Sequence, residues 1–353
     1  MAEQERRPVA GDYPDALLGL FQGFMGSAAM KTGLDLEVFT HIAHGVDTAE
    51  KLAAAKHLTV RAARILCDAL VAFGALRKEE GRYTLPAASQ SLLVKGSPAY
   101  IGGMATLMGN RVLWNEAGRL TDVVKAGHAL VEQSGEAENN PFWADFARGT
   151  RQTAEMAGRA VAEAAASLFP ATSGPNRILD IACGSGFYGF SALKRFPEAR
   201  LVSVDWAGVL KLAETNAHQA GVAERVQFRS GDIFSSDLGR GYDLLLAVNI
   251  YHHFSIEKCT ELSRRLYEAA APGGVLVVVD AVADDTREKE RFALAFAFAL
   301  TMLLWTRDGD TYTLSEYEKM LIAAGFNDIE LKPISGPSPM QAVIARHRKK
   351  TES

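Results

Sequence analysis

Two adjacent histidines, His252 and His253, follow an apolar run at residues 242–248, and Asp280 closes another apolar run at residues 275–280. Imidazole is the side chain best suited to accept a proton near neutral pH, and a nearby carboxylate can orient it. Apolar runs of this length are typical of buried parallel strands, whose carboxyl ends meet at one edge of a sheet. The pattern therefore predicts a site that removes a proton from a bound molecule.

A glycine-rich turn points to a second kind of chemistry. The apolar run at residues 178–182 leads into Gly184-Ser185-Gly186, after which a helical pattern begins. Glycine lets the backbone come close to a ligand, and a strand-to-helix turn lies at the ligand-binding edge of an open α/β sheet. The next apolar run ends in Asp205, where an acid can accept hydrogen bonds from both hydroxyls of a ribose. These features predict a binding site for a cofactor that contains a nucleoside.

The series of runs also predicts the fold. A third run, at residues 226–228, leads into Gly231-Asp232-Ile233-Phe234, and the run at residues 242–248 ends at Asn249. The fifth run follows a turn, Ala271-Pro272-Gly273-Gly274. Strands that alternate with helical patterns are typical of βαβ units. We therefore predict an α/β fold with a Rossmann-like, doubly wound, mostly parallel sheet.

These motifs carry a resemblance to a known family. The stretch from Asp180 to Gly186, then Asp205, the Gly231-Asp232 pair and the Pro-Gly-Gly turn resemble the class I S-adenosylmethionine-dependent methyltransferases. The segments Ile250 to Ser255 with Glu257 and Cys259, Thr313 to Tyr317, and Ala324-Gly325-Phe326 resemble the small-molecule O-methyltransferases of plants and bacteria, which include caffeate, flavonoid and natural-product enzymes. The resemblance covers most of residues 15–346.

The resemblance implies S-adenosyl-L-methionine as the cofactor and assigns residues to it. Gly184, Ser185 and Gly186 would admit its amino-acid tail, Asp205 would bind the ribose, and Asp180 would order the glycine loop. The remaining cofactor-binding candidates are Trp206, Asp232, Ile233, Phe234 and Asn249. Among these, Asp232 would accept a hydrogen bond from the adenine amino group, and Trp206 and Phe234 would sandwich the adenine.

The resemblance also selects the base. Aligning the family segment on Ile250, Glu257 and Cys259 assigns the catalytic role to His252, with Asp280 as its orienting acid, and places His253 where the family usually has aspartate. A phenol has a pKa of about 10, so its proton must be removed as the methyl group arrives. The family's second orienting acid falls on Thr311, with Asp310 beside it. This departure keeps a non-methylating reaction open.

The N-terminal third predicts a separate unit. Residues 12–45 look helical, residues 48–54 and 59–73 form two further helices, and a hairpin follows at residues 76–85. This is the order of an all-helical, winged-helix-type domain with its wing. Lys and Arg number 11 over residues 1–100, and Asp and Glu also number 11, a difference of 0 that argues against DNA binding. The resemblance implies that this unit makes a homodimer, with no nucleic-acid partner.

The resemblance divides the chain into three parts. Residues 1–105 would form the dimerisation domain, residues 106–170 a helical connector contributing to the substrate pocket, and residues 171–347 the cofactor-binding domain. Within the connector, the residues predict one long, alanine-rich helix from Phe142 towards Phe169. The candidate residues of the acceptor pocket are apolar or aromatic: Phe24, Met104, Met108, Trp114, Phe142, Phe146, Phe298, Met302 and Trp305. They predict a small, apolar, aromatic hydroxyl compound as the acceptor.

Composition argues against several other classes of protein. The 353 residues carry a net charge of −4, which argues against a general polyanion binder. The three cysteines, Cys67, Cys183 and Cys259, make neither a metal pattern nor a disulfide framework, which fits the cytoplasm. The polar N-terminus does not resemble a signal peptide, and the apolar run at residues 292–305 is shorter than the roughly 20 residues that span a bilayer. We expect no metal site and no membrane partner.

Four alternatives to an O-methyltransferase stay open. Gly184, Gly186 and Gly189 match the Gly-x-Gly-x-x-Gly spacing of a nicotinamide dehydrogenase. The acceptor atom is not encoded in the motifs, so an N- or C-methyltransferase has the same signature. The third alternative is a family member that keeps the cofactor for another reaction. The fourth is a transcriptional regulator.

Overall fold

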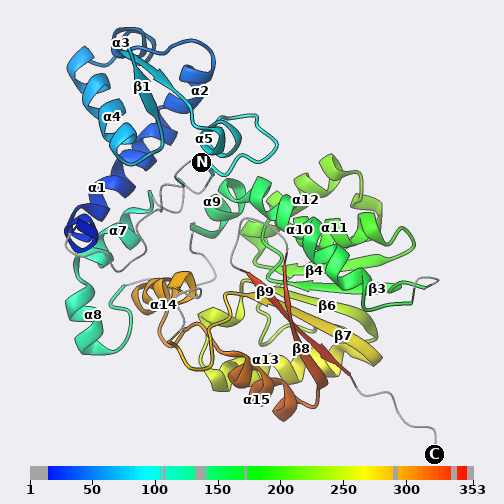
Figure 1. Ribbon diagram of the computed structural model, residues 1–353. Helices are drawn as coiled ribbons and strands as arrows, with labels where there is room; N and C mark the ends of the chain where they lie inside the picture. The colour runs from blue at the N-terminus through cyan, green and yellow to red at the C-terminus, as the bar shows by residue number, and fades with distance from the viewer. Residues whose placement is uncertain are drawn as a thin grey trace, which may run out of the picture. The chain divides into compact units, whose positions relative to one another are not determined.

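The computed structural model describes residues 15–103, 105, 109–131, 140, 142–170, 173–288, 293–334 and 340–347. The chain forms two compact units, Met1–Gly109 and Asn110–Ser353 (Figure 1). The division into three parts, at residues 105 and 170, stays a prediction. Among the described residues, no helix is both long enough and apolar enough to cross a membrane.

The first unit consists of helices and one hairpin. Its elements are α1 (Asp15–Asp35), α2 (Val38–Ala43), α3 (Ala49–Lys56), α4 (Val60–Ala72), β1 (Arg77–Glu79), β2 (Arg82–Thr84) and α5 (Ala87–Leu92). The hydroxyls of Thr48 and Thr59 accept hydrogen bonds from backbone N–H groups and so fix the starts of α3 and α4. The antiparallel pair β1–β2 turns at Gly81, whose φ of 79° favours glycine. This hairpin follows α4 and completes the winged-helix order.

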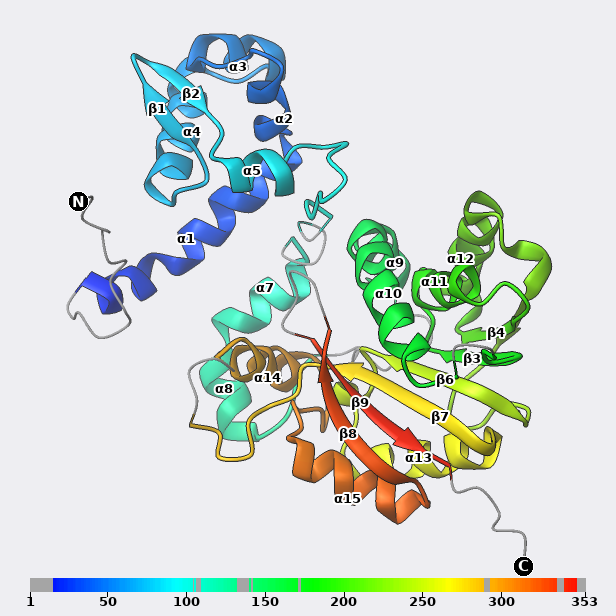
Figure 2. The ribbon, with the colours of Figure 1, turned by 45° about the vertical axis from the view of Figure 1, so that its right-hand side comes forward.

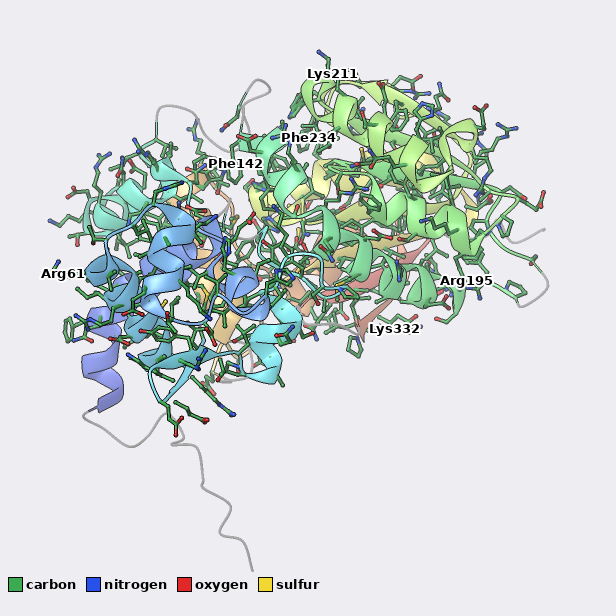
Figure 3. All side chains as sticks on the ribbon, turned by 90° about the horizontal axis from the view of Figure 1, so that it is seen from above. Arg61, Phe142, Arg195, Lys211, Phe234 and Lys332 are labelled. Atoms are coloured by element: carbon green, nitrogen blue, oxygen red, sulfur yellow. The ribbon has the colours of Figure 1, made fainter. Side chains whose placement is uncertain are left out.

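Two exposed faces of the first unit differ in chemistry. On α4, Arg64 pairs with Asp68 at 3.0 Å, and Arg61 projects outward (Figure 3). On α1, by contrast, large apolar side chains face solvent. Their exposed fractions are 75% for Leu20, 79% for Phe21, 62% for Phe24 and 53% for Met25. A run of apolar side chains this exposed marks α1 as an interaction face.

The second unit is built on one seven-stranded sheet. Its strands are β3 (Arg177–Ile181), β4 (Arg200–Asp205), β5 (Val226–Ser230), β6 (Tyr242–Val248), β7 (Ala270–Asp280), β8 (Asn327–Pro333) and β9 (Gln341–Arg346). They lie in the order β5-β4-β3-β6-β7-β9-β8. The first five are parallel, and β9 is antiparallel to both β7 and β8. The predicted doubly wound, mostly parallel sheet is confirmed.

Helices cover both faces of this sheet (Figure 2). The cluster on one face includes side chains of α10 (Arg151–Ala166), α11 (Phe187–Arg195) and α12 (Ala207–Ala220), and the cluster on the other includes side chains of α13 (Ile256–Ala269) and α15 (Leu314–Ala324). Strand residues alternate between the two clusters, as Leu244 and Leu245 do. The other helices are α7 (Arg111–Gly118), α8 (Leu120–Ala126), α9 (Phe142–Gly149) and α14 (Ala293–Trp305). This arrangement places the carboxyl ends of the parallel strands at one edge.

Two local expectations need correction. The sequence predicts one long helix from Phe142 towards Phe169, but the helix breaks between α9 and α10 at Thr150. Gly149 and the β-branched Thr150 are weak helix formers, which explains the break. The Pro-Gly-Gly turn, predicted to precede the fifth strand, lies inside β7, where the register against β6 shifts between Tyr242 and Leu244. The turn therefore distorts the strand instead of starting it.

Candidate active site

The glycine turn after β3 adopts the backbone conformation that its sequence predicts. Gly184 and Gly186 have φ values of 55° and 84°, in the left-handed region that favours glycine. Ala182 also has a positive φ, 49°, which is strained for a residue with a Cβ. A Cβ added at Gly186 would meet the ring of Phe190 at 2.2 Å, whereas one added at Gly184 would have no atom within 4 Å. The turn is thus packed on one side and open at Gly184.

Asp205 joins this turn to the end of β4. Its Oδ2 accepts a hydrogen bond from the Gly184 N–H at 2.8 Å, and its Oδ1 accepts one from the Trp206 N–H at 2.7 Å. Burial in this corner raises the pKa of Asp205 to about 6, against the lowering effect of the two N–H donors. At neutral pH the carboxylate is ionised, and its other lone pairs are free to accept hydrogen bonds.

Asp180 lies beneath the turn and away from solvent. Only 1% of its surface is exposed, and its Oδ2 accepts a hydrogen bond from the Gly189 N–H at 3.1 Å. Burial raises the pKa of Asp180 to about 8. A Cβ added at Gly189 would meet both Asp180 and Leu201 at 2.7 Å, so Gly189 permits the close packing of α11 on the sheet. Asp180 and Gly189 are placed to order the loop.

The segment after β5 forms a second turn at the same edge of the sheet. Asp232 Oδ1 accepts a hydrogen bond from the Phe234 N–H at 2.7 Å, which closes a tight turn around the buried Ile233. Arg265 of α13 holds this turn from below by donating to the Ile233 carbonyl at 2.9 Å and to the Ser236 carbonyl. The Phe234 ring meets the Phe254 ring edge to face, with 4.9 Å between the ring centroids. The turn is therefore connected to the segment that carries the histidines.

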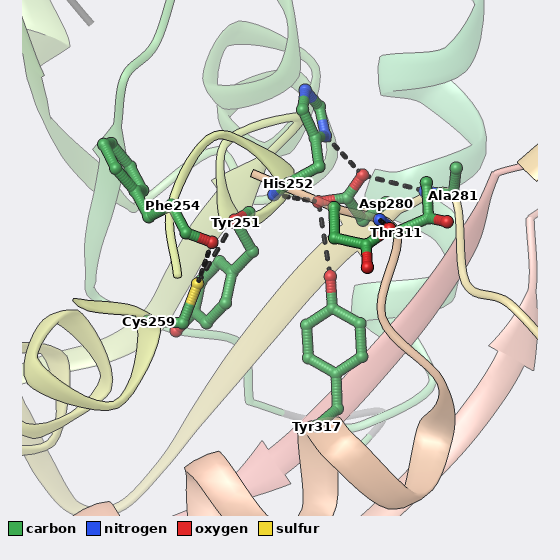
Figure 4. A network of polar contacts seen from close by, with 9 residues as sticks. Tyr251, His252, Phe254, Cys259, Asp280, Ala281, Thr311 and Tyr317 are labelled. Atoms are coloured by element: carbon green, nitrogen blue, oxygen red, sulfur yellow. Dashed lines mark hydrogen bonds and ion pairs between the residues drawn. The ribbon is translucent and has the colours of Figure 1, made fainter. Parts of the chain in front are cut away.

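His252, which follows β6, and Asp280, the last residue of β7, face each other (Figure 4). His252 Nδ1 lies 2.6 Å from Asp280 Oδ1, and both side chains are buried, with 5% and 1% exposed. Asp280 also accepts hydrogen bonds from the backbone N–H groups of Ala281 at 2.8 Å and His252 at 3.2 Å, and from the Tyr317 hydroxyl at 3.3 Å. Four donors satisfy this buried carboxylate, so it can orient the imidazole with Nδ1–H as donor and leave Nε2 as the basic atom.

Aromatic rings surround the two imidazoles. The Phe298 ring of α14 packs edge-on against His252 at 4.8 Å, and the ring centroids of His252 and His253 are 4.5 Å apart. The Trp143 ring of α9 packs edge-on against His253 at 5.2 Å. Burial, and the neighbouring His252, lower the pKa of His253 well below its usual value. His253 is therefore neutral at physiological pH.

Asn249, the last cofactor candidate, lies between the glycine turn and the histidines. It follows β6 with a positive φ of 55°, and its backbone N–H donates to the Val279 carbonyl at 2.9 Å. Strained backbone at both Ala182 and Asn249, past the paired strands β3 and β6, is typical of a functional edge. The structure thus brings the candidates from Asp180 to Asp280 together at one edge of the sheet.

Thr311 occupies the place where the resemblance expects a second acid. A parallel bridge between Ala283 and Thr313 aligns this segment with the residues after β7, and Figure 4 places Thr311 beside Asp280. Thr311 is completely buried, and its hydroxyl has no hydrogen-bond partner in the described structure. Asp310 accepts a hydrogen bond from the Thr311 N–H at 2.7 Å.

Comparison with known proteins decides the family. Residues 124–327 match the model of the O-methyltransferase domain, and residues 18–95 match the O-methyltransferase dimerisation domain. The chain is 31% identical over 354 residues to acetylserotonin O-methyltransferase of Mus musculus molossinus, with 91% of this chain and 86% of the relative covered. The chain belongs to the O-methyltransferase family.

Other O-methyltransferases agree with this assignment. The tetracenomycin polyketide synthesis 8-O-methyl transferase TcmO of Streptomyces glaucescens is 28% identical over 330 residues, which cover 93% of this chain and 95% of that protein. The crystal structure of human N-acetylserotonin methyltransferase in complex with SAM shares the fold, with a TM-score of 0.81, 23% identity, and 97% and 100% of the two chains covered. The protein is a methyltransferase that uses S-adenosyl-L-methionine.

The edge of the sheet at which the parallel strands end fits S-adenosyl-L-methionine. The open position at Gly184 leaves room for a ligand beside the loop. The Asp205 carboxylate offers acceptors where hydroxyls are expected, and the rings of Trp206 and Phe234 are partly exposed. The nicotinamide alternative, which rested on the glycine spacing alone, is not supported. The cofactor roles of the individual residues stay predictions.

Three contacts at the site were not predicted from the sequence. Tyr317 donates to Asp280, Phe298 packs on His252, and Trp143 packs on His253. Tyr317 belongs to the motif at residues 313–317, so its position just inside a helix was the available signal. The side chains of α9 and α14 carry no polar motif, and only the fold brings them to the histidines. Met104 and Met108, two candidate pocket residues, lie outside the described residues.

Proposed function

We propose that this O-methyltransferase methylates a hydroxyl group of a small, apolar, aromatic acceptor, with His252 as the general base. The observation that carries the proposal is the 2.6 Å contact between His252 Nδ1 and Asp280 Oδ1 in a buried, ring-lined corner. The ring of Phe298 against His252 supports a flat, apolar acceptor. The names of the relatives, acetylserotonin and tetracenomycin O-methyltransferases, support a small-molecule substrate as well.

In this mechanism His252 Nε2 accepts the proton of the acceptor hydroxyl as its oxygen attacks. Asp280 keeps the Nδ1–H tautomer and stabilises the imidazolium that results, while Tyr317 and the two backbone donors hold the carboxylate. The cofactor, when bound, supplies an activated methyl group on a positively charged sulfur. Buried surroundings at His252 exclude water from the proton transfer.

We propose that the predicted cofactor residues act as the sequence indicates. Asp205 binds the ribose hydroxyls, Asp232 binds the adenine amino group, and Trp206 and Phe234 flank the adenine. Gly184, Ser185 and Gly186 admit the amino-acid tail, Asp180 orders their loop, and Ile233 and Asn249 complete the contact surface. The shared edge and the open position at Gly184 support these roles.

Thr311 bears on whether the reaction needs a second acid. Asp280 has a full set of donors without any carboxylate at position 311. A second ionised carboxylate beside Asp280 in this buried place would cost free energy. We infer that the pair His252–Asp280 suffices and that the absent acid does not point to a non-methylating reaction.

We further propose a homodimer that forms through the first unit. The match to a dimerisation domain and the exposed apolar side chains of α1 support it. The equal numbers of basic and acidic residues over residues 1–100 argue against nucleic acid as a partner. The three cysteines are buried and free, which is consistent with the cytoplasm.

The proposed function is tested by the position of the transferred methyl group. The purified enzyme is incubated with methyl-labelled S-adenosyl-L-methionine and a panel of aromatic hydroxyl compounds that starts with N-acetylserotonin and 2-naphthol. We expect the label on oxygen, as a methyl ether identified by NMR. A label on carbon or nitrogen, or cofactor binding without transfer to any hydroxyl, would contradict the proposal.

A further inference from the structure

The face of α14 that contacts the base continues to a buried indole. Phe298 packs on His252, and Trp305 follows seven residues later, which is close to two helical turns and places both on one face of α14. At a rise of 1.5 Å per residue, the two positions lie about 10 Å apart along the helix. Trp305 is therefore remote from His252 but on the same side of the helix.

Aromatic residues of α9 pack against both Trp305 and the histidines. The Phe142 ring meets the Trp305 ring edge-on at 5.1 Å, and the adjacent Trp143 meets His253 at 5.2 Å. Phe142 and Trp143 also contact each other at 5.1 Å. A continuous row of rings thus runs from the histidines through α9 to Trp305. Such a row suits a flat aromatic molecule.

Trp305 has an unsatisfied polar atom. Only 4% of its surface is exposed, and its Nε1–H finds no hydrogen-bond partner in the described structure. Buried indole N–H groups usually have a partner, because an unpaired donor away from water costs free energy. The Nδ1 atom of His253, at the other end of the row, is likewise buried without a partner. Both ends of the row therefore lack a hydrogen bond that a bound molecule can supply.

We propose that Trp305 Nε1–H recognises a neutral carbonyl oxygen at the end of the acceptor remote from the methylated hydroxyl. Indole is a donor only, so the matching atom must be an acceptor. Trp305 packs against the uncharged Phe142 ring, and such a site favours a neutral oxygen over a carboxylate. This proposal rests on the proposed function for the place of the hydroxyl at His252. It adds the substrate class, a flat aromatic hydroxyl compound with a distal ketone or quinone oxygen.

Two naphthols of matched shape test this subsite. They are 6-acetyl-2-naphthol and 6-isopropenyl-2-naphthol, which differ by replacement of the carbonyl oxygen with a methylene group. Calorimetry measures the dissociation constant of each from the enzyme saturated with S-adenosylhomocysteine, so no turnover is needed. We expect the wild-type enzyme to bind the acetyl compound about tenfold more tightly. In Trp305→Phe, which keeps a ring but removes the donor, the preference should fall by about the same factor while binding of the isopropenyl compound changes little.

The outcomes separate this proposal from the proposed function. Equal or tighter binding of the isopropenyl compound by the wild-type enzyme, failure to bind either compound, or a preference that survives Trp305→Phe would each overturn the role of Trp305. If the variant does not fold, the ratio of the two dissociation constants on the wild-type enzyme still tests the proposal. Failure of the proposed function appears elsewhere, as the absence of methyl transfer to oxygen, and does not alter the ratio of the two dissociation constants.

Discussion

His252 Nδ1 lies 2.6 Å from Asp280 Oδ1, although 28 residues separate the two in the chain. The contact exists because β6 and β7 are parallel neighbours, His252 lies in the short 3-10 turn after β6, and Asp280 is the last residue of β7. A second bond, from the His252 backbone N–H to Asp280 Oδ2 at 3.2 Å, fixes the relative orientation of the two side chains. The buried pair thus has one defined tautomer, which is what a base acting through Nε2 requires.

The donors on Asp280 predict a graded series of variants. Asp280→Asn replaces an acceptor of the Nδ1–H bond with a neutral amide, so kcat should fall, by less than in His252→Ala. Tyr317→Phe removes one of four donors and should lower kcat by less than about tenfold. Steady-state kinetics with a hydroxyl acceptor provides the check. A Tyr317→Phe variant that is more impaired than Asp280→Asn would show that Tyr317 acts on the acceptor itself.

Cofactor affinity should depend on pH through Asp205. Burial raises its pKa to about 6, so the carboxylate proposed to bind the ribose becomes protonated as the pH falls through 6. The dissociation constant of S-adenosyl-L-methionine, measured by calorimetry between pH 5 and 8, should rise below pH 6 by up to about tenfold per pH unit. Asp205→Ala should weaken binding by about 1.5–3 kcal/mol at pH 8 and remove this pH dependence. Unchanged affinity in the variant would refute the role of Asp205.

The raised pKa of Asp180 leads to a prediction about the pH dependence of stability. Its folded-state pKa of about 8 exceeds the unfolded value of about 3.9, so the folded state holds the proton more tightly and stability falls as the pH rises between these values. Asp180→Asn stays neutral and can still accept the hydrogen bond from Gly189. The variant should therefore melt at least about 2 °C above wild type at pH 9, with a smaller difference at pH 5. Thermal melts without cofactor test this, and a difference that does not vary with pH would count against it.

The apolar face of α1 predicts the assembly. Phe21→Asp combined with Phe24→Asp puts two charges on a face whose rings are 79% and 62% exposed, and should convert a dimer into a monomer. Light scattering at micromolar concentration measures the mass. Ile322→Asp is the matched control, since Ile322 is 62% exposed on α15 and should leave the dimer intact. A wild-type monomer, or a double variant that still dimerises, would exclude this interface.

Features set by local sequence were predictable, and features set by distant contacts were not. The strand ends at Asp205 and Asp280 follow from apolar runs, and the starts of α3 and α4 follow from threonine caps. The break at Thr150 was missed because the stretch that follows it is alanine-rich and has high helix propensity. Phe298 was predicted as a pocket residue but not as a neighbour of His252, and Trp143 was not predicted at all, since an aromatic residue on a helix looks the same whether it faces a core or a base. Their role emerges only when α9 and α14 pack near the strand ends.

The replacement of aspartate by His253 is a similar case. The sequence places a second imidazole beside the base, and only the resemblance to the family selects His252 as the partner of Asp280. The fold settles the geometry, because Asp280 bonds to His252 while His253 packs among rings.

The most direct test of His252 as the base is the turnover of His252→Ala with an aromatic hydroxyl acceptor, measured together with cofactor affinity. A positioned base contributes about 10²–10⁴-fold to the rate, so kcat should fall within that range while the dissociation constant of S-adenosyl-L-methionine stays near the wild-type value. His253→Ala, measured in parallel, should be affected far less. Wild-type turnover in His252→Ala, or an essential His253 beside a dispensable His252, would contradict the assignment of the base.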